Sequence, residues 1–140
     1  MSFSVSSIDI SYNPLVKDLN TDFLFKSMRL KLNELNLEGN NVGDDLVLKL
    51  CEWMNNFKRL NLTKNLITNK GALAISEAIL INYVTIALYL GWNNIKYKGA
   101  AAICDALNEN DKMQIIDLSF NPIGIGKKKG QKNYDMTHQK

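Results

Sequence analysis

Residues 57–67, FKRLNLTKNLI, contain the pattern that decides the fold of this chain. Four apolar side chains and one Asn occupy the first, fourth, sixth, ninth and eleventh positions, as Phe57, Leu60, Leu62, Asn65 and Ile67. The same skeleton occurs five times, with copies that start near residues 5, 32, 57, 85 and 113. A repeat of this length predicts a solenoid, in which each unit buries its apolar side chains against the next unit.

A short strand is predicted at positions four to six of each copy, where apolar and variable residues alternate. Leu60 and Leu62 flank Asn61 in this way, so that one face is buried and the other stays outside the core. The chain then turns away from the sheet, and each backbone group that is buried unpaired there costs about 1–3 kcal/mol. An Asn side chain supplies both an acceptor and donors. We therefore expect a structural ladder formed by Asn13, Asn40, Asn65, Asn93 and Asn121.

The second half of each unit is predicted to be helical, because apolar side chains recur there at three- and four-residue steps. The pattern is clear at residues 44–54, 70–81 and 99–107, and a weaker version covers residues 19–30. Asp44 or Asp45, and Asn69, stand where helix N-caps are expected. Parallel strands on one side and helices on the other give a curved α/β stack. Thr85 replaces an apolar residue and the second unit is short, so we expect irregular structure near residues 54–57 and at the start of the fourth strand.

This skeleton resembles the leucine-rich repeat, and the helices at residues 69–79 and 98–107 look like those of the ribonuclease-inhibitor-like subclass. The resemblance covers roughly residues 5–126. It implies an α/β leucine-rich repeat solenoid, a right-handed β–α superhelix of about five repeats within a domain at residues 1–126. The strands would form the concave face and the helices the convex face. It also implies protein–protein recognition on the concave face, although a fold alone does not select a partner.

Composition places the chain among ordinary globular proteins, because 46% of its 140 residues are hydrophobic and 22% are charged. No apolar run approaches the roughly 20 residues of a membrane span, and no signal peptide is visible. Cys51 and Cys104 are two units apart, roughly 20 Å at about 10 Å per helix layer, whereas a disulfide needs Cα atoms within about 7 Å. We expect both to be reduced core residues, which favours an intracellular, cytoplasmic location.

Positive charge is concentrated in residues 127–140. This segment holds five lysines and one aspartate, a net charge of +4 that leaves −1 for residues 1–126 out of the total of +3. It is expected to be a disordered, solubilising tail, and contact with nucleic acid or another acidic surface is the alternative. A short lysine run without interleaved aromatic residues favours the tail, so nucleic acid is not the expected partner.

Recognition is expected on the outward face of the sheet, at positions three, five, seven and eight of each copy. Burial in the core does not explain aromatic residues there, and exposed aromatic clusters are typical of interfaces. The alternative is that Trp92 and Phe120 fold down over the Asn turns. Arg59 and Lys64 form a charged middle that would add specificity. The predicted partner-binding residues are Tyr12, Glu34, Arg59, Tyr89, Trp92, Asp117 and Phe120.

The outward face is small for an interface. Five strands span about 20 Å and each strand is about 12 Å long, which gives about 240 Å², against about 800 Å² per partner in a standard interface. Either adjoining loops take part, or binding is weak, or the chain assembles through its ends. No capping module is recognisable and the fifth unit lacks a helix, so a second copy, a larger partner, the folded-back tail or a longer repeat array would cover these ends.

Non-enzymatic protein interaction or scaffolding is the leading prediction. One alternative is a regulator of another enzyme, such as a GTPase-activating protein that places Arg59 beside a bound nucleotide. Another is a nucleic-acid-associated protein that acts through the tail. No cofactor, metal or catalytic site is predicted, because His138 is the only histidine and no nucleophile–base pair or metal-spaced Cys/His cluster is present. The glycines of residues 124–130 lack the spacing of a phosphate-binding loop.

Overall fold

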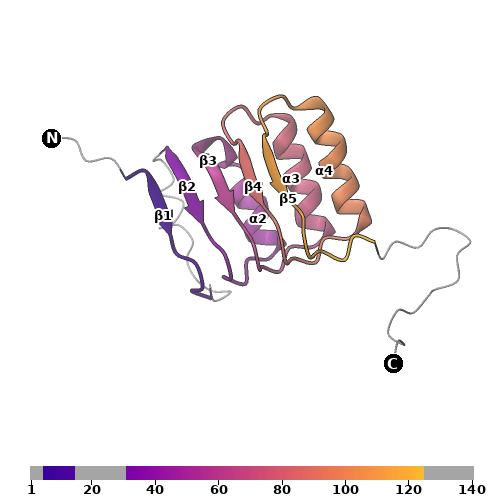
Figure 1. Cartoon of the computed structure of the whole chain (residues 1–140), viewed down its shortest axis with the longest axis horizontal. Helices are drawn as coiled ribbons and strands as arrows, with labels where there is room; N and C mark the ends of the chain where they lie inside the picture. Colours follow the sequence, from indigo (N-terminus) through magenta and orange to yellow (C-terminus); the bar gives the residue numbers. More distant parts are fainter. Residues whose placement is uncertain (1–4, 15–30, 125–140) are drawn as a thin grey trace, which may run out of the picture.

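The computed structural model describes residues 5–14 and 31–124, in which five strands form one sheet with helices along one face (Figure 1). In chain order the elements are β1 (Ser7–Asp9), β2 (Leu32–Asn36), α2 (Asp44–Cys51), the 3₁₀ helix η1 (Met54–Asn56), β3 (Phe57–Asn61), α3 (Asn69–Leu80), β4 (Ala87–Tyr89), α4 (Tyr97–Glu109) and β5 (Ile115–Asp117). Three predictions concern residues outside the described ranges. They are the weak helix at residues 19–30, the absence of a helix from the fifth unit, and the tail at residues 127–140.

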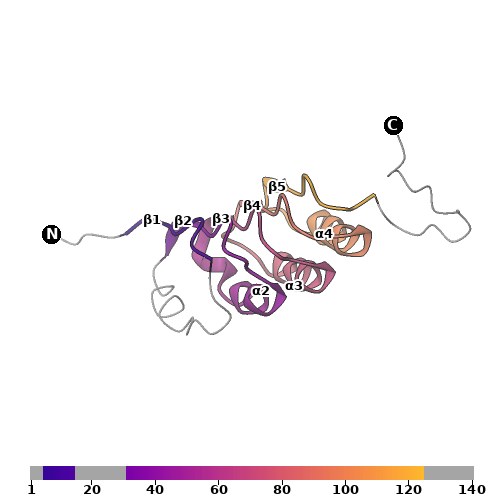
Figure 2. The same ribbon diagram turned by 90° about the horizontal axis from the view of Figure 1, so that it is seen from below.

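The strands pair in chain order, β1-β2-β3-β4-β5, and every pairing is parallel. Equivalent positions of successive copies are aligned, so that Leu35 of β2 lies beside Leu60 of β3 and Leu60 beside Leu88 of β4. Helices α2, α3 and α4 lie side by side on one side of the sheet (Figure 2). The predicted α/β solenoid is therefore confirmed. We call the opposite side the open face, because no described helix covers it.

Apolar side chains from the strands and the helices meet between these two layers. Leu35, Leu88 and Leu90 from the sheet side are fully buried, and so are Ile75 and Ile79 of α3. Leu/Ile burial of this kind contributes about 1.5–3 kcal/mol per side chain. The equivalent residues of the fifth coil are only partly buried, namely Ile116, Leu118 and Ile123. The core is thus densest in the second to fourth coils.

The irregularity expected from the short second unit is present. Helix α2 ends at Cys51, earlier than the predicted limit of residue 54, and η1 leads directly into β3. Thr85 is fully buried in the adjacent coil. Its hydroxyl lies 2.6 Å from the carbonyl oxygen of Met54 and 2.8 Å from that of Phe57. Thr85 thus supplies a hydrogen bond to the chain where the 3₁₀ turn interrupts the regular repeat.

The predicted N-caps are wrong by one residue at Asp44 and Asn69 and by two at Asp45. The caps of α2 and α3 are Gly43 and Thr68, whereas Asp44 and Asn69 are the first helical residues and Asp45 is the second. Thr68 caps its own helix, because its side chain accepts a hydrogen bond from the backbone N–H of Lys70. Gly43 provides no side-chain cap for α2. Asp44 and Asn69 instead act on the neighbouring coil.

Each of these two side chains binds the start of the next helix. Oδ1 of Asp44 accepts hydrogen bonds from the backbone N–H groups of Thr68 at 2.8 Å and Gly71 at 3.0 Å. Oδ1 of Asn69 accepts from the N–H of Gly99 at 3.0 Å in the same way. A Cβ at Gly71 would lie 2.5 Å from Oδ1 of Asp44, so this approach requires glycine. These bonds satisfy helix N–H groups that have no intrahelical partner and fix adjacent coils to each other.

Both cysteines are free thiols. Cys51 is half-buried and packs against the core, but Cys104 is exposed, which corrects the expectation that both are core residues. The two occupy equivalent positions in α2 and α4. Among the described helices, α3 follows α2 in the stack, whereas α4 is the last helix, so its outer flank has no described neighbour.

Candidate protein-binding surface

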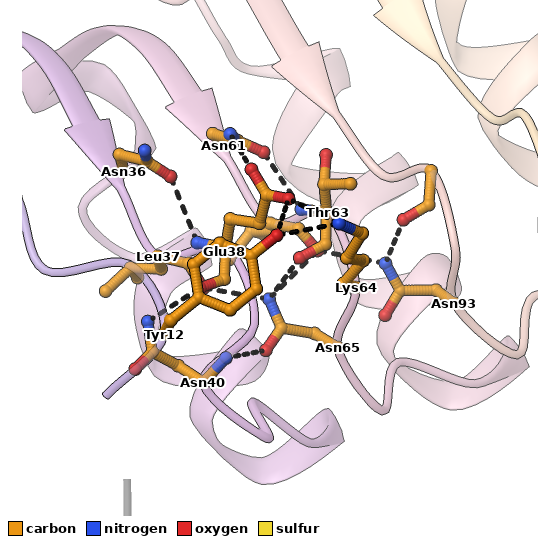
Figure 3. Close-up of polar contacts among 12 residues, drawn as sticks. Tyr12, Asn36, Leu37, Glu38, Asn40, Asn61, Thr63, Lys64, Asn65 and Asn93 are labelled. Carbon is orange, nitrogen blue, oxygen red and sulfur yellow. Dashed lines mark hydrogen bonds and ion pairs between the residues drawn. The ribbon is translucent and has the colours of Figure 1, made fainter. Parts of the chain in front are cut away.

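Asparagine side chains at the ends of the strands connect successive coils (Figure 3). Nδ2 of Asn65 donates to the carbonyl oxygens of Leu62 in its own coil and Leu37 in the preceding coil, both at 3.0 Å. Its Oδ1 accepts from the N–H groups of Asn40 at 3.0 Å and Val42 at 2.9 Å. Asn13, Asn40, Asn93 and Asn121 make equivalent bonds to their turns. Among the described residues, no buried side-chain nitrogen or oxygen lacks a partner.

The residue before each ladder Asn adopts a left-handed backbone conformation. The φ angles are 55° at Tyr12, 68° at Gly39, 53° at Lys64, 55° at Trp92 and 54° at Phe120. Such angles cost roughly 1–2 kcal/mol for a residue that has a Cβ. Glycine would avoid this cost, yet only one of these five positions holds glycine. The strained turn presents four large side chains beside the open face.

Tyr12, Glu38 and Lys64 form one cluster over the first three coils (Figure 3). The hydroxyl of Tyr12 donates to Oε1 of Glu38 at 2.6 Å, and Nζ of Lys64 donates to the Tyr12 hydroxyl at 2.7 Å. Nζ of Lys64 also lies 3.2 Å from Oε1 of Glu38 and 5.3 Å from the centroid of the Tyr12 ring. A Cβ at Gly39 would lie 2.7 Å from the Tyr12 ring, so only glycine leaves room for it.

The two charges of this cluster, on Glu38 and Lys64, stabilise each other. The hydrogen bond from Tyr12 lowers the pKa of Glu38 below its ordinary value, and Lys64 acts in the same direction. The pKa of Lys64 is raised, first by its hydrogen bond to Tyr12 and then by Glu38. Tyr12 was predicted to bind a partner. Its hydroxyl is already engaged, although its ring stays exposed.

Trp92 and Phe120 form an aromatic stack on the fourth and fifth coils. Their ring centroids are 4.3 Å apart with an interplanar angle of 13°. Trp92 is 54% exposed and Phe120 is 69% exposed, although Asn93, the ladder residue that follows Trp92, is buried. The rings therefore pack on each other and leave most of their surface in solvent. Tyr89 and Asp117 are aligned neighbours on β4 and β5, so the register brings four predicted site residues to one end of the open face.

Glu34 and Arg59 are also aligned neighbours, on β2 and β3. Glu34 is half-buried and Arg59 is exposed. The ion pairs within 4.0 Å in the described part of the chain join Lys64 to Glu38, Lys70 to Asp45 and Lys112 to Asp111. Of the two cations in the predicted charged middle, Lys64 is therefore paired, and Arg59 makes none of these ion pairs.

Sequence reasoning missed two further rows of polar side chains. At the fifth position of four of the five copies, a side-chain oxygen accepts from the backbone N–H two residues later, in Asp9, Asn36, Asn61 and Asp117; the fourth copy has Tyr89 there. At the helix-to-strand turns, Asn82 and Asn110 bind nearby backbone groups, including the carbonyl oxygen of Thr85 for Asn82. The sequence contained a signal for both rows. Asp or Asn recurs at position five, and Asn stands three residues before each of the last two copies.

Comparison with known proteins agrees with this architecture. Residues 30–51, 54–76 and 87–104 match the family described as Leucine Rich repeat. The chain is a leucine-rich repeat protein. It is similar to the protein phosphatase 1 regulatory subunit 37 homologs of Caenorhabditis elegans and Caenorhabditis briggsae, with 26% identity over 124 residues in each case. The match covers 84% of this chain and only 13% of those proteins.

A solved structure of the same kind is the actin-binding site 2 of leiomodin-1. The match to it has a TM-score of 0.70 at 21% identity and covers 82% of this chain and 70% of that structure. It supports the fold of this leucine-rich repeat protein and nothing finer. Within residues 5–14 and 31–124, no helix has the length and apolarity needed to cross a membrane. The same residues contain no group of three or more His, Cys, Asp and Glu side chains placed to hold a metal ion.

Proposed function

We propose that the chain is a non-enzymatic interaction or scaffold module that binds a protein partner through the open face and its adjoining turns. The observation that carries this proposal is the exposed Trp92–Phe120 stack, which stands on the turns that follow β4 and β5. The contact would centre on the fourth and fifth coils. Tyr89 and Asp117 are aligned neighbours on β4 and β5, the two strands that lead into the turns of Trp92 and Phe120.

The energetics of the stack favour a role outside folding. Aromatic side chains bury about 150–250 Å² each when they are covered, and they dominate the energetics of interfaces. In the free protein, Trp92 and Phe120 forgo much of this burial and also hold left-handed backbone angles. A partner that covers both rings would recover the burial and extend the interface beyond the small sheet face, onto the turns.

The comparisons support a binding role in general terms. The two nematode relatives are named regulatory subunits, a role that involves contact with another protein, and the solved structure is named an actin-binding site. Because this chain spans only 13% of those relatives and the structural match is at 21% identity, neither a phosphatase nor actin is proposed as the partner.

Photo-cross-linking in cells tests this proposal. A benzoylphenylalanine at position 120 lies in the proposed contact, and the same group at position 73 is the matched control, because Leu73 is an exposed apolar residue of α3. We expect a partner adduct from position 120 that falls about tenfold or more when Trp92→Ala is added, since a central aromatic contributes roughly 2 kcal/mol or more. Equal adducts from both positions, or adducts from position 73 alone, would contradict the proposal.

A further inference from the structure

Asp117 carries a carboxylate oxygen that the fold leaves unused beside the aromatic stack. Its Oδ1 accepts from the N–H of Ser119 at 2.8 Å. Its Oδ2 lies 3.1 Å from the point where a Cβ on Gly91 would stand, and Gly91 is the residue that precedes Trp92. Within the described residues, Oδ2 has no hydrogen-bond partner, and no lysine or arginine lies within 4.0 Å of it.

The charge of the open face is negative overall. Its outward positions hold four acidic side chains, Asp9, Glu34, Glu38 and Asp117, against the two basic side chains Arg59 and Lys64. Lys64 is already paired with Glu38. The remaining side chains leave an excess of two negative charges, which complements a cationic group on a partner. Asp117 is the acid of this set that lies beside the aromatic stack.

We propose that Asp117, Trp92 and Phe120 form a binding site for an arginine side chain of the protein partner, an inference that rests on the proposed function. A guanidinium is planar and weakly hydrated, and it stacks on aromatic faces while it donates hydrogen bonds in its own plane. One side chain can therefore cover an exposed ring and bond Oδ2 of Asp117. A lysine ammonium cannot stack in this way.

Nuclear magnetic resonance titration with blocked tetrapeptides tests the site directly. The three probes are acetyl-Gly-Arg-Arg-Gly-amide and the versions in which lysine or neutral citrulline replaces both arginines. We expect the arginine peptide to shift the indole N–H signal of Trp92 and the amide signal of Asp117 in a saturable way. The lysine peptide should bind several-fold more weakly, and the citrulline peptide should give no saturable shift. The indole signal of Trp53, which packs against the core between α2 and η1, serves as the internal control.

Asp117→Asn removes the charge and keeps the local structure, because Asn36 and Asn61 accept the same type of backbone hydrogen bond in their own coils. We expect this variant to bind the arginine peptide about fivefold more weakly, the effect of losing a partly exposed ion pair. Asp9→Asn is the matched control. Asp9 makes the same bond to Ser11, but it lies on β1, at the other edge of the sheet.

Equal binding of the three peptides, or full binding by Asp117→Asn, would overturn the arginine site. Signal shifts that depend on the protein concentration and not on the peptide would mean that a second copy of the chain covers the stack. This result would also overturn the arginine site. In either case, a Trp92-dependent adduct from position 120 would leave the proposed function standing. Conversely, arginine binding at Asp117 without any such adduct would support the site and count against the proposed function.

Discussion

Leu62 and Trp92 separate stability from recognition at the scale of the residue. Leu62 is buried in the third coil, so Leu62→Ala should lower the free energy of unfolding by about 2–5 kcal/mol. Trp92 is more than half exposed, and Trp92→Ala should cost about 1.5 kcal/mol or less, the value of an aromatic stack. Urea denaturation measures both. A larger loss from Trp92→Ala than from Leu62→Ala would show that the stack belongs to the core.

Trp92→Gly tests the strain in the turn. Glycine adopts the observed φ of 55° freely, whereas alanine does not. Trp92→Gly should therefore be more stable than Trp92→Ala by about 1 kcal/mol, even though glycine gains more freedom in the unfolded chain. The difference between the two midpoints in urea gives the value. Equal or lower stability of the glycine variant would show that the turn is not strained.

Asn65 tests the ladder. Its side chain is buried and bonds backbone groups of its own coil and of the preceding one, so Asn65→Ala leaves several buried groups unpaired. Each such group costs about 1–3 kcal/mol, and we expect a loss of roughly 3 kcal/mol or more. Urea denaturation with far-ultraviolet circular dichroism measures it. Asn61→Ala is the control and should cost about 1 kcal/mol, because it removes one part-buried bond to the N–H of Thr63 and a long contact of 3.5 Å with Oε2 of Glu38.

The two thiols are predicted to differ in reactivity. Burial, followed by the negative charges of Glu77 and Glu52, raises the pKa of Cys51 from its ordinary value of 9.0 to about 12. Because the folded pKa is the higher one, the neutral thiol favours folding below pH 9, and this contribution falls as the pH rises toward 12. At pH 8 we expect maleimide to label exposed Cys104 quickly and Cys51 only on unfolding. Mass spectrometry after Cys104→Ser would reveal any rapid labelling of Cys51 that contradicts this.

Side chains that point toward solvent in a repeat pattern are harder to interpret than those of the core. The register assigned Trp92 and Phe120 to the outward side without any structure, because the apolar ridges fix the alternation. The same pattern could not show that Tyr12 bonds Glu38 and Lys64, since these contacts join coils that are 26 and 52 residues apart in the chain. Asp117 was selected for its place on the face, but its bond to Ser119 depends on the turn geometry that follows β5.

At the scale of the element, the cross-coil bonds of Asp44 make the start of α3 depend on α2. Asp44→Ala should cost about 1–2 kcal/mol, because it leaves the N–H groups of Thr68 and Gly71 without this acceptor. Asp45→Ala is the control, since Asp45 makes only an exposed ion pair with Lys70 and should change stability by less than about 0.5 kcal/mol. Thermal unfolding compares the two variants.

Hydrogen exchange locates the effect of Asp44→Ala within the chain. Relative to the unsubstituted protein, we expect exchange to become faster mainly in the first turn of α3, and less so in the first turn of α2, which carries the substitution. The reverse result would mean that Asp44 caps its own helix, as the sequence alone suggested. Helix periodicity predicted α3 well, at residues 70–81 against the observed Asn69–Leu80. It could not reveal that a helix start is bonded from the preceding coil, because the relevant spacing is 24 to 27 residues.

At the scale of the whole molecule, the two sides of the leucine-rich repeat stack differ: one side is covered by helices, and the other carries the proposed binding surface. Leu/Ile ridges and Asn turns hold the coils together, and helices α2 to α4 lie on one side of the sheet. None of the described helices covers the other side, where the aromatic stack and Asp117 lie toward the β5 end. The repeat made this architecture predictable because five copies in one register leave few other ways to bury the apolar positions. The partner is outside what such a pattern encodes.

Hydrogen–deuterium exchange with and without the partner found by cross-linking tests most directly which side of the stack binds that partner. We predict slower exchange in residues 87–92 and 115–121 when the partner is bound, and unchanged exchange along the solvent-facing turns of α2, α3 and α4. Slower exchange confined to those helices, with β4, β5 and their turns unaffected, would contradict the open face as the binding surface.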